Sequence, residues 1–371
     1  MTAPGLYIHI PFCLRKCPYC DFYSCAFEAE LADAYVQTLC DLMTDGHFAP
    51  IQGQKMDTVY FGGGTPSLLG VNRLEKLLYT AQKAYGLTAD AEITLEANPA
   101  TVHAADFSDL RRAGFNRLSV GVQSGNDAEL LLLGRPHTAA DAADAITAAE
   151  QAGFANISAD VMLAIPGQTM TSMAKTLDFL CALPISHVSA YPLKVEEGTE
   201  FSRRGIVPDE DFCADSYLES GRLLEEKGFL QYEISNFARP GCESRHNNKY
   251  WQLVPYLGLG PGAHSFWQGR RFSFAPDLPG FLQKPMATLA DEGIGGSAEE
   301  YIMLRLRLRA GLNRRDMAAR YPAQQDLWEN LEKKARPLAQ RGLVVITSEH
   351  IALAGREAFL LSNSIIGALL P

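Results

Sequence analysis

Three cysteines near the beginning of the chain stand close enough together to bind one metal centre. Cys13, Cys17 and Cys20 lie within residues 7–22, which read YIHIPFCLRKCPYCDF. Three thiolates from one loop suit an iron–sulfur cluster whose fourth ligand comes from elsewhere, so that one iron stays open to another molecule. A tetrahedral zinc site needs a fourth ligand, and Cys25 is the near candidate, but its spacing fits no common zinc pattern. We therefore expect a metal-binding loop after a strand.

Further polar residues stand at or near the ends of apolar stretches. Glu96, Gln123 and Asp160 have this position, and the glycines 62–64 directly follow another such stretch. Glycine lets a ligand approach the backbone because it has no side chain. The run lacks the lysine of a phosphate-binding loop and the spacing of a dinucleotide fingerprint, so neither a nucleoside triphosphate nor NAD is indicated. Three acceptors beside an open iron suit a small ligand with an ammonium group and ribose hydroxyls.

The elements that must position these residues alternate between strands and helices. From residue 5 to about 192, short β-branched runs alternate with patterns of helical period, which is typical of βαβ units in a parallel sheet. Six such units predict an α/β fold with a partial (β/α)6 barrel, open on one side and carrying its chemistry at the C-terminal ends of the strands. The expected strands are 6–10, 58–61, 93–96, 117–122, 157–163 and 187–191.

The pattern divides the chain into three parts. Residues 1–192 form the expected barrel domain. Residues 193–295 are rich in glycine, proline and aromatic residues, contain one clear helix at about 210–227, and are expected to form a lid or side wall. Helical runs followed by two short β-prone pieces predict a small C-terminal helical domain over 297–371, similar to a winged helix.

The composition argues against several classes of protein. The chain has 371 residues, of which 47% are hydrophobic and 20% charged, as in a globular protein. The net charge of −10 and the lack of a dense basic segment argue against nucleic acid as a partner. We find neither a secretory signal nor an apolar stretch of membrane-spanning length. Eight cysteines, three of them clustered, fit metal binding in a reducing cytoplasm, which is the expected location.

Several motifs together resemble a known family. CxxxCxxC, GGGTPS, ITLEANP, RLSVGVQS, GRPHT and PGQT resemble the radical S-adenosylmethionine (radical SAM) superfamily, specifically its coproporphyrinogen-III-oxidase-like branch. Within that branch the chain is similar to the HemW-type haem chaperones. This second likeness rests on YEISNFA at 232–238, HNNKYW at 246–251, GLGPGAHS at 258–265 and LSN at 361–363.

The resemblance implies a set of ligands for two cofactors. Cys13, Cys17 and Cys20 would hold a [4Fe-4S] cluster, and S-adenosylmethionine would complete its fourth iron. The protein would orient this cofactor, while the radical chemistry belongs to the cofactor itself. The positions that match S-adenosylmethionine contacts of the family are Tyr7, Tyr19, Gly64, Thr65, Glu96, Gln123, Arg135 and Asp160.

A haem site is implied by the downstream motifs. His246 opens HNNKYW, which matches the HNxxYW pattern of the haem chaperones, and imidazole is a common axial ligand of haem iron. Tyr250 and Trp251 would pack on a porphyrin face. His264 is a second haem candidate, whereas His9 is expected to be a packed core residue. The implied function is to bind haem and to deliver it to acceptor haemoproteins, with an electron donor as a further partner.

Two departures separate the chain from the porphyrinogen oxidases. Those enzymes have a cysteine where Phe22 stands, and they carry a longer segment before the first strand. Coproporphyrinogen dehydrogenase activity is therefore not expected, although an oxygen-independent coproporphyrinogen III oxidase-like enzyme, a radical methyltransferase and a haem-degrading enzyme remain the alternatives. Ala164 and Gly125 also depart from the family pattern, at loop positions outside the expected ligands. The sequence leaves open cleavage of S-adenosylmethionine, a homodimer and peripheral membrane association.

Overall fold

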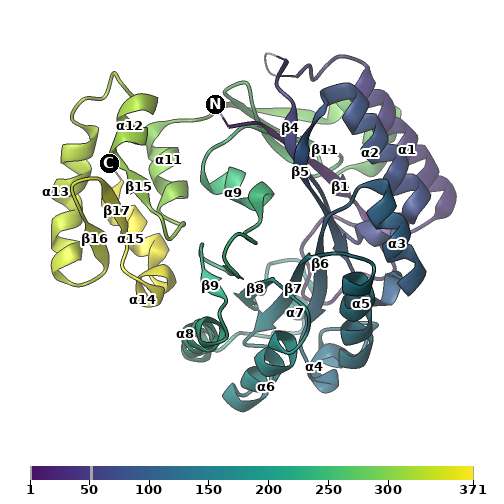
Figure 1. Cartoon of the computed structure of the whole chain (residues 1–371), viewed down its shortest axis with the longest axis horizontal. Helices are drawn as coiled ribbons and strands as arrows, with labels where there is room; N and C mark the ends of the chain where they lie inside the picture. The colour runs from purple at the N-terminus through teal and green to yellow at the C-terminus, as the bar shows by residue number, and fades with distance from the viewer. Residues whose placement is uncertain (1, 51–52, 371) are drawn as a thin grey trace.

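The computed structural model describes residues 2–50 and 53–370 and is centred on one large sheet. Within these residues the sheet has 12 strands, and seven neighbouring strands run parallel and curve into an open barrel (Figure 1). The seven are, in spatial order, β11 (Tyr256–Leu259), β1 (Gly5–Ile10), β4 (Met56–Gly63), β5 (Leu87–Ala97), β6 (Arg117–Gln123), β7 (Asn156–Leu163) and β8 (His187–Pro192).

Helices cover the outer face of this sheet (Figure 1). Alternate residues of each strand point to opposite faces, so Ile93 and Leu95 of β5 pack under the helices while Thr94 and Glu96 point into the barrel. The barrel interior is consequently polar and the outer layer apolar. The main covering helices are α1 (Ala29–Thr44), α2 (Val71–Tyr85), α3 (Ala104–Ala113), α5 (Ala139–Gln151), α6 (Met170–Cys181) and α8 (Glu210–Glu226).

The six expected strands are confirmed, and the sheet is wider than the sequence predicts. Residues 193–295 extend it at both edges, so the division at residue 192 does not coincide with a break in the sheet. β11 was missed because it is short and lies among glycines, and because its parallel partner β1 is far away in the sequence. The other added strands are β9 (Leu230–Gln231), β10 (Asn236–Ala238), β12 (His264–Trp267), β13 (Arg270–Phe274) and β14 (Leu289–Ile294).

Short elements hold the loops at the C-terminal ends of the strands. The cysteine loop is closed by a parallel pair in which β2 (Phe12–Cys13) joins β3 (Cys25–Ala26). The loop before α5 is held by Thr138, whose hydroxyl accepts from the backbone of Asp141 over 3.2 Å. The remaining short helices are α4 (Asp127–Leu132), α7 (Glu200–Arg203), α9 (Arg245–Trp251), α10 (Leu278–Gln283) and the 3-10 turns Pro66–Leu69, Pro99–Thr101 and Pro285–Thr288.

The C-terminal part packs around a second apolar cluster. Trp328, Leu331, Ile351 and Phe359 are buried in it together with Tyr256 and Phe266 of the large sheet. A three-stranded antiparallel sheet packs against helices, and α12, α13 and the β16–β17 hairpin follow one another as in a winged helix. The elements are α11 (Ala298–Arg305), β15 (Leu312–Asn313), α12 (Arg314–Arg320), α13 (Leu327–Gln340), β16 (Val344–Ile346), β17 (His350–Leu353), α14 (Arg356–Leu360) and α15 (Ser362–Leu369).

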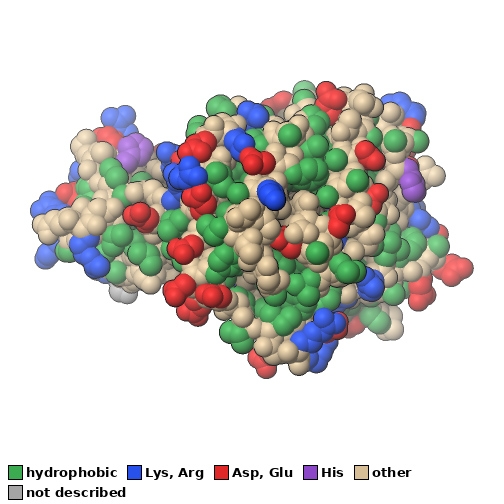
Figure 2. All heavy atoms as spheres, turned by 90° about the horizontal axis from the view of Figure 1, so that it is seen from below, with side chains coloured by type: hydrophobic (Ala, Val, Ile, Leu, Met, Phe, Trp, Pro, Cys, Tyr) green, Lys and Arg blue, Asp and Glu red, His purple; other side chains and the backbone are tan. Residues whose placement is uncertain are grey.

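Charge is mixed on the surface that Figure 2 shows. Lysine and arginine side chains alternate there with aspartate and glutamate, and apolar side chains lie between them. Among the described residues, none of the helices combines the length and the apolar character needed to cross a bilayer.

The outer core can be tested at Leu95, which is fully buried beneath the helices. Leu95→Ala is expected to lower the free energy of unfolding by about 2–5 kcal/mol because it leaves a cavity in a packed layer. Urea unfolding of the ligand-free protein measures this loss. The control is Leu131→Ala, since Leu131 is 79% exposed and its loss should change stability by less than about 0.5 kcal/mol. Equal losses in both variants would contradict the packing described.

Candidate functional site

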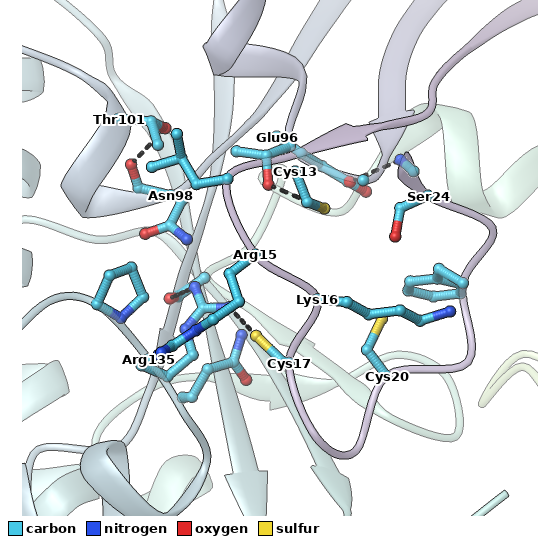
Figure 3. A pocket seen from close by; sticks show the side chains of 18 of the residues that line it. Cys13, Arg15, Lys16, Cys17, Cys20, Ser24, Glu96, Asn98, Thr101 and Arg135 are labelled. Carbon is cyan, nitrogen blue, oxygen red and sulfur yellow. Dashed lines mark hydrogen bonds between the residues drawn. The ribbon is translucent and has the colours of Figure 1, made fainter. Parts of the chain in front are cut away.

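One cavity lies at the C-terminal ends of the parallel strands, beneath the cysteine loop. It encloses about 1080 Å³ of space that opens to solvent. Figure 3 shows the loop crossing the cavity, with the side chains of Cys13, Cys17 and Cys20 approaching it from one side. Most of the site residues expected from the sequence line it together: Cys13, Cys17, Tyr19, Cys20, Gly64, Thr65, Glu96, Gln123, Arg135 and Asp160.

The three thiols are partly buried and have hydrogen-bond donors beside them. The hydroxyl of Thr65 donates to Sγ of Cys13 over 3.5 Å, and Nη1 of Arg135 donates to Sγ of Cys17 over 3.7 Å. Burial raises the pKa of the Cys20 thiol to about 11, and the neighbouring Cys17 and Cys13 add to the rise. The Cys20 thiol therefore favours the protonated form until a positive centre binds it.

The three thiols of the loop line one cavity. Among the described residues, no three His, Cys, Asp or Glu side chains converge closely enough to hold one metal ion. A [4Fe-4S] cluster needs only one thiolate for each iron, so three more widely spaced thiols suit it. Cys25 does not line the cavity, and its thiol donates to the carbonyl of Pro11 over 3.4 Å. The loop thus presents three of its four thiols to the cavity.

Glycines let the cysteine loop lie directly on β4. A Cβ atom at Gly64 would stand 2.7 Å from the carbonyl oxygen of Phe12 and 3.1 Å from Sγ of Cys13, so a larger residue would push the loop away. Gly63 has a φ of +114°, a backbone angle that residues other than glycine rarely adopt. The glycine run of the sequence is therefore required by close approach and by backbone conformation.

Glu96 is held at the end of β5 by two donors. The hydroxyl of Tyr60 donates to Oε1 over 2.8 Å, and the backbone of Gly63 donates to Oε2 over 3.0 Å. Burial and, to a smaller extent, the nearby Asp160 raise the pKa of Glu96 to about 7, although these two hydrogen bonds act to lower it. A cationic ligand would favour the ionised form, because it removes the cost of a buried negative charge.

Asp160 on β7 lies two residues beyond Ser158, the residue that is level with Glu96 in the strand register. Its carboxylate accepts from the hydroxyl of Ser119 at 3.0 and 3.2 Å and from the hydroxyl of Ser158 over 3.4 Å. Burial raises its pKa to about 6. Two half-buried acceptors that line one cavity suit a ligand that carries positive charge and hydroxyl donors.

Gln123 and Arg135 complete the far wall of the cavity. Gln123 has a φ of +69° at an irregularity in the β6–β7 pairing, and this re-aims its side chain towards Tyr191, whose hydroxyl donates to it over 3.1 Å. Nη2 of Arg135 donates to the carbonyl of Gly121 over 2.9 Å. Tyr19 lies beside Arg135, which lowers the pKa of its hydroxyl against the larger rise that burial causes. Arg135 is a cation available to a ligand carboxylate on this wall, and Arg15 and Lys16 of the cysteine loop also line the cavity.

Tyr7 and His246, also expected from the sequence, do not line this cavity. They lie deeper in the barrel, where their ring centroids are 6.4 Å apart. His246 is fully buried, and both of its ring nitrogens are hydrogen-bonded, Nδ1 to Thr58 over 2.8 Å and Nε2 to Tyr250 over 2.8 Å. Burial lowers its pKa to about 3, so the ring is neutral. The structure thus separates the haem motif from the cysteine loop.

The other two histidines have different surroundings. His9 is buried, and its ring nitrogens contact the hydroxyl of Tyr7 at 3.1 Å and the carbonyl of Tyr23 at 3.2 Å, which agrees with a packed core residue. The side chain of His264 is 65% exposed and lies 3.3 Å from Glu292. His264 is therefore not in contact with His246 or with the cavity.

Several lining residues were not expected from the sequence. Ser119 sits two residues after the start of β6, and its alternation with Leu118 and Val120 was the available signal that it points inward. Asn98, Thr101 and Tyr191 also line the cavity. These three stand in loops or at a strand end, where periodicity does not tell which way a side chain points.

The backbone conformation at Ala164 explains why glycine is usual at this position of the family pattern. Its φ is +55°, a region that favours glycine, so alanine is strained here. Gly125 is packed closely, since a Cβ atom there would stand 3.0 Å from the ring of Phe179. Neither residue lines the cavity.

Comparison with known proteins finds two matching families. The Radical SAM superfamily matches residues 7–180, and the HemN C-terminal domain matches residues 297–360. The chain is also similar to a solved structure, the coproporphyrinogen III oxidase HemN of Escherichia coli. The TM-score is 0.85 over 99% of this chain and 90% of that one, at 24% identity, which establishes the likeness of fold.

Curated relatives are similar over most of their length. The haem chaperone HemW of Escherichia coli (strain K12) is 40% identical over 312 residues, which are 82% of this chain and 82% of that protein. HemW of Mycobacterium tuberculosis (strain H37Rv) is 34% identical over 99% of this chain and 94% of its own. The mitochondrial radical S-adenosyl methionine domain-containing protein 1 of Bos taurus is 39% identical over 71% of this chain and 61% of its own.

The buried Glu96 predicts a pH dependence of stability. Burial raises its folded-state pKa from 4.5 to about 7, so between these values the folded protein binds more protons than the unfolded chain. The free energy of unfolding contributed by this group therefore falls as pH rises through that window. Glu96→Gln removes this fall. Relative to the native protein, the variant should gain on the order of 2 kcal/mol between about pH 5 and about pH 8.

Urea unfolding of the ligand-free protein at both pH values measures this change. The control is Glu150→Gln on the exposed face of α5, which should keep a constant difference from the native protein. The pH slope is the readout, because Gln also alters the hydrogen bonds of Glu96 with Tyr60 and Gly63 at every pH. A Glu96→Gln variant with the native pH slope would contradict the burial of this carboxyl.

Proposed function

Because the chain belongs to the radical SAM superfamily and, within it, to the HemW family of haem chaperones, we propose that it binds haem and delivers it to acceptor haemoproteins. A [4Fe-4S] cluster with S-adenosylmethionine is the cofactor that the superfamily implies. The observation that carries the proposal is the convergence of three cysteines, the half-buried carboxyls of Glu96 and Asp160, and Arg135 on a single cavity.

The cysteine loop fits the cluster. Cys13, Cys17 and Cys20 supply three thiolates, which leaves one iron open to a further ligand. Arg135 and Thr65 stand beside two of the sulfurs and would stabilise their negative charge. Bound in this way, the reduced cluster would supply an electron to the sulfonium of S-adenosylmethionine.

The remaining residues of the cavity fit S-adenosylmethionine. Glu96 and Asp160 present acceptors from β5 and β7, which suit the ammonium group and the ribose hydroxyls. Arg135 is placed for the ligand carboxylate, since it already lines the cavity beside Cys17. Gln123 and Tyr19 would then contact the ligand from the same wall. The protein's part is to orient the cofactor and to limit access of water to it.

Haem binding is assigned in this proposal to α9 and its neighbours. Trp251 on α9 lies against the guanidinium of Arg307, which is 6.0 Å from the ring centroid. Nη2 of Arg307 in turn donates to Asn363 over 2.9 Å. Two motifs of the haem chaperones, HNNKYW and LSN, are thereby brought together at the C-terminal domain. Ligation by His246 requires it to leave Tyr250 or Thr58, because both ring nitrogens are engaged.

The electron donor would approach the cysteine loop from outside. Leu14 is 59% exposed and Phe22 is 62% exposed on this loop. Arg15 and Lys16 stand between the first two cysteines, and both side chains are exposed. An apolar surface with positive charges beside it suits a partner that carries negative charge at its own redox centre.

The cluster assignment predicts the effect of removing its ligands. Replacing Cys13, Cys17 and Cys20 together by serine should abolish the visible absorption of the reconstituted protein and its iron and sulfide content. Haem binding should persist, because α9 lies apart from the loop. Cys25→Ser is the matched control and should keep the cluster, since Cys25 bonds the backbone of Pro11 instead. Loss of the cluster in the control, or its retention in the triple variant, would contradict the assignment.

The haem assignment predicts opposite effects for two neighbours on α9. His246→Ala should lower haem affinity by about 10-fold or more, because the iron loses its axial ligand. Tyr250→Phe keeps the ring and frees Nε2 of His246, so haem binding should be kept or strengthened. Titration followed by the Soret band measures both. Native-like haem binding in His246→Ala would remove the basis for this ligand.

A further inference from the structure

The barrel interior contains a buried arginine without a partner. Arg117, the first residue of β6, is 2% exposed, and its Nε has no hydrogen-bond partner. No ion pair involves it within residues 2–50 and 53–370. A buried guanidinium remains charged under all ordinary conditions and is costly unless an anion offsets it.

A second unpartnered polar group lies next to it. Thr94 on β5 is fully buried, and its hydroxyl oxygen makes no hydrogen bond. Thr94 and Arg117 are register partners in the parallel pairing of β5 and β6. Both alternate with core residues that pack under the helices, so both point into the barrel. One hydroxyl and one guanidinium thus share a layer of the interior.

This layer lies directly below the cavity. The next register pair of these strands that points into the barrel is Glu96 with Ser119, and both of those line the cavity. Burial raises the pKa of Glu96 and of Asp160, and the guanidinium of Arg117 partly offsets this rise. Arg117 is therefore close to the cavity floor but makes no hydrogen bond with either carboxyl.

The haem motif faces the same interior. Glu92 on β5 accepts from the backbone nitrogen of His246 over 3.0 Å, and Thr94 stands two residues further along the same strand, towards Glu96. Burial lowers the pKa of His246, and the charges of Lys249 and Arg117 lower it further. His187 and Tyr232 stand on the other side, with 2.9 Å between Nε2 and the hydroxyl. The layer that Thr94 and Arg117 share, called the positive layer below, thus lies between the cavity and α9.

The charges indicate an anion of a definite kind. A cationic cofactor that occupies Glu96 and Asp160 removes the negative charge nearest to Arg117 and leaves the guanidinium uncompensated. The planar fork of arginine matches a carboxylate with two parallel hydrogen bonds, and a hydroxyl beside it donates a third.

We propose that Arg117 and Thr94 form a carboxylate-binding site in the barrel interior that holds a propionate group of the haem. This inference rests on the proposed haem function and deepens it. In this arrangement the propionate lies on the α9 side of the positive layer, and the cofactor lies on the other side. Arg117 is a positioning residue for the haem and takes no part in ligation of its iron.

Haem and its dimethyl ester test the proposal, because esterification removes the negative charge of both propionates. The full chain with its reconstituted cluster is titrated with each and followed by the Soret band. The native protein should bind haem more tightly than the ester. Arg117→Gln should weaken haem binding by about 10- to 100-fold and leave ester binding unchanged. Thr94→Val, which keeps the shape of the side chain, should weaken haem binding by about 2- to 10-fold.

Arg112→Gln is the matched control, since this guanidinium lies on the outer helix α3 with 77% of its side chain exposed. Equal affinity of the native protein for haem and ester would overturn the inference while leaving haem binding itself intact. The inference would also be overturned if Arg117→Gln weakened S-adenosylmethionine binding and left the ratio of haem to ester affinity unchanged, since the arginine would then serve only to balance Glu96 and Asp160. A native protein that bound neither compound would instead refute the proposed function.

Discussion

Two carboxyls, Glu96 and Asp160, are half-buried at the mouth of the curved sheet, and much of the surrounding structure serves to make that partial burial tolerable. An ionised group taken out of water costs several kcal/mol unless donors and opposite charge surround it. Tyr60 and Ser119 supply donors from the neighbouring strands, and Arg117 supplies positive charge from the layer below. The mouth of the sheet is therefore preorganised for a cationic ligand, because such a ligand offsets the carboxylate charge that the protein groups offset only in part.

Hydrogen bonds between polar side chains of the barrel interior connect this mouth of the sheet with α9. Ser158 contacts both Asp160, over 3.4 Å, and His187, over 2.7 Å. His187 contacts the hydroxyl of Tyr232 over 2.9 Å, and that hydroxyl accepts from the backbone of Ser244, the residue that caps α9, over 3.3 Å. Buried polar groups must find partners inside the protein, so hydrogen bonds run from strand to strand across the barrel. The mouth of the sheet and α9 are consequently joined by one hydrogen-bond network.

Short β-branched runs that alternate with helical patterns were sufficient to predict the six strands and to place Glu96, Gln123 and Asp160 at the cavity, whereas Tyr19, Thr65 and Arg135 were expected only from the family resemblance. Glu96 stands one residue before the end of β5 and Asp160 in the second half of β7, and parallel strands bring such positions towards one edge. β11 escaped this reasoning because it has four residues among glycines and joins β1 across most of the chain. Gln123 was expected in the site, but its aim depends on a local irregularity of β6 that no periodicity reveals.

Local spacing alone predicted a three-thiolate site in the cysteine loop, because the cysteines of such a loop are neighbours along the chain and need no distant contact to converge. The state of His246 could not be read in this way. Its partner Thr58 is 188 residues away, and its burial depends on how α9 closes the barrel. The same is true of Arg117, whose missing partner is visible only when every neighbouring strand is in place. Burial and hydrogen bonding depend on contacts between segments that are distant in the sequence. These contacts exist only in the folded chain.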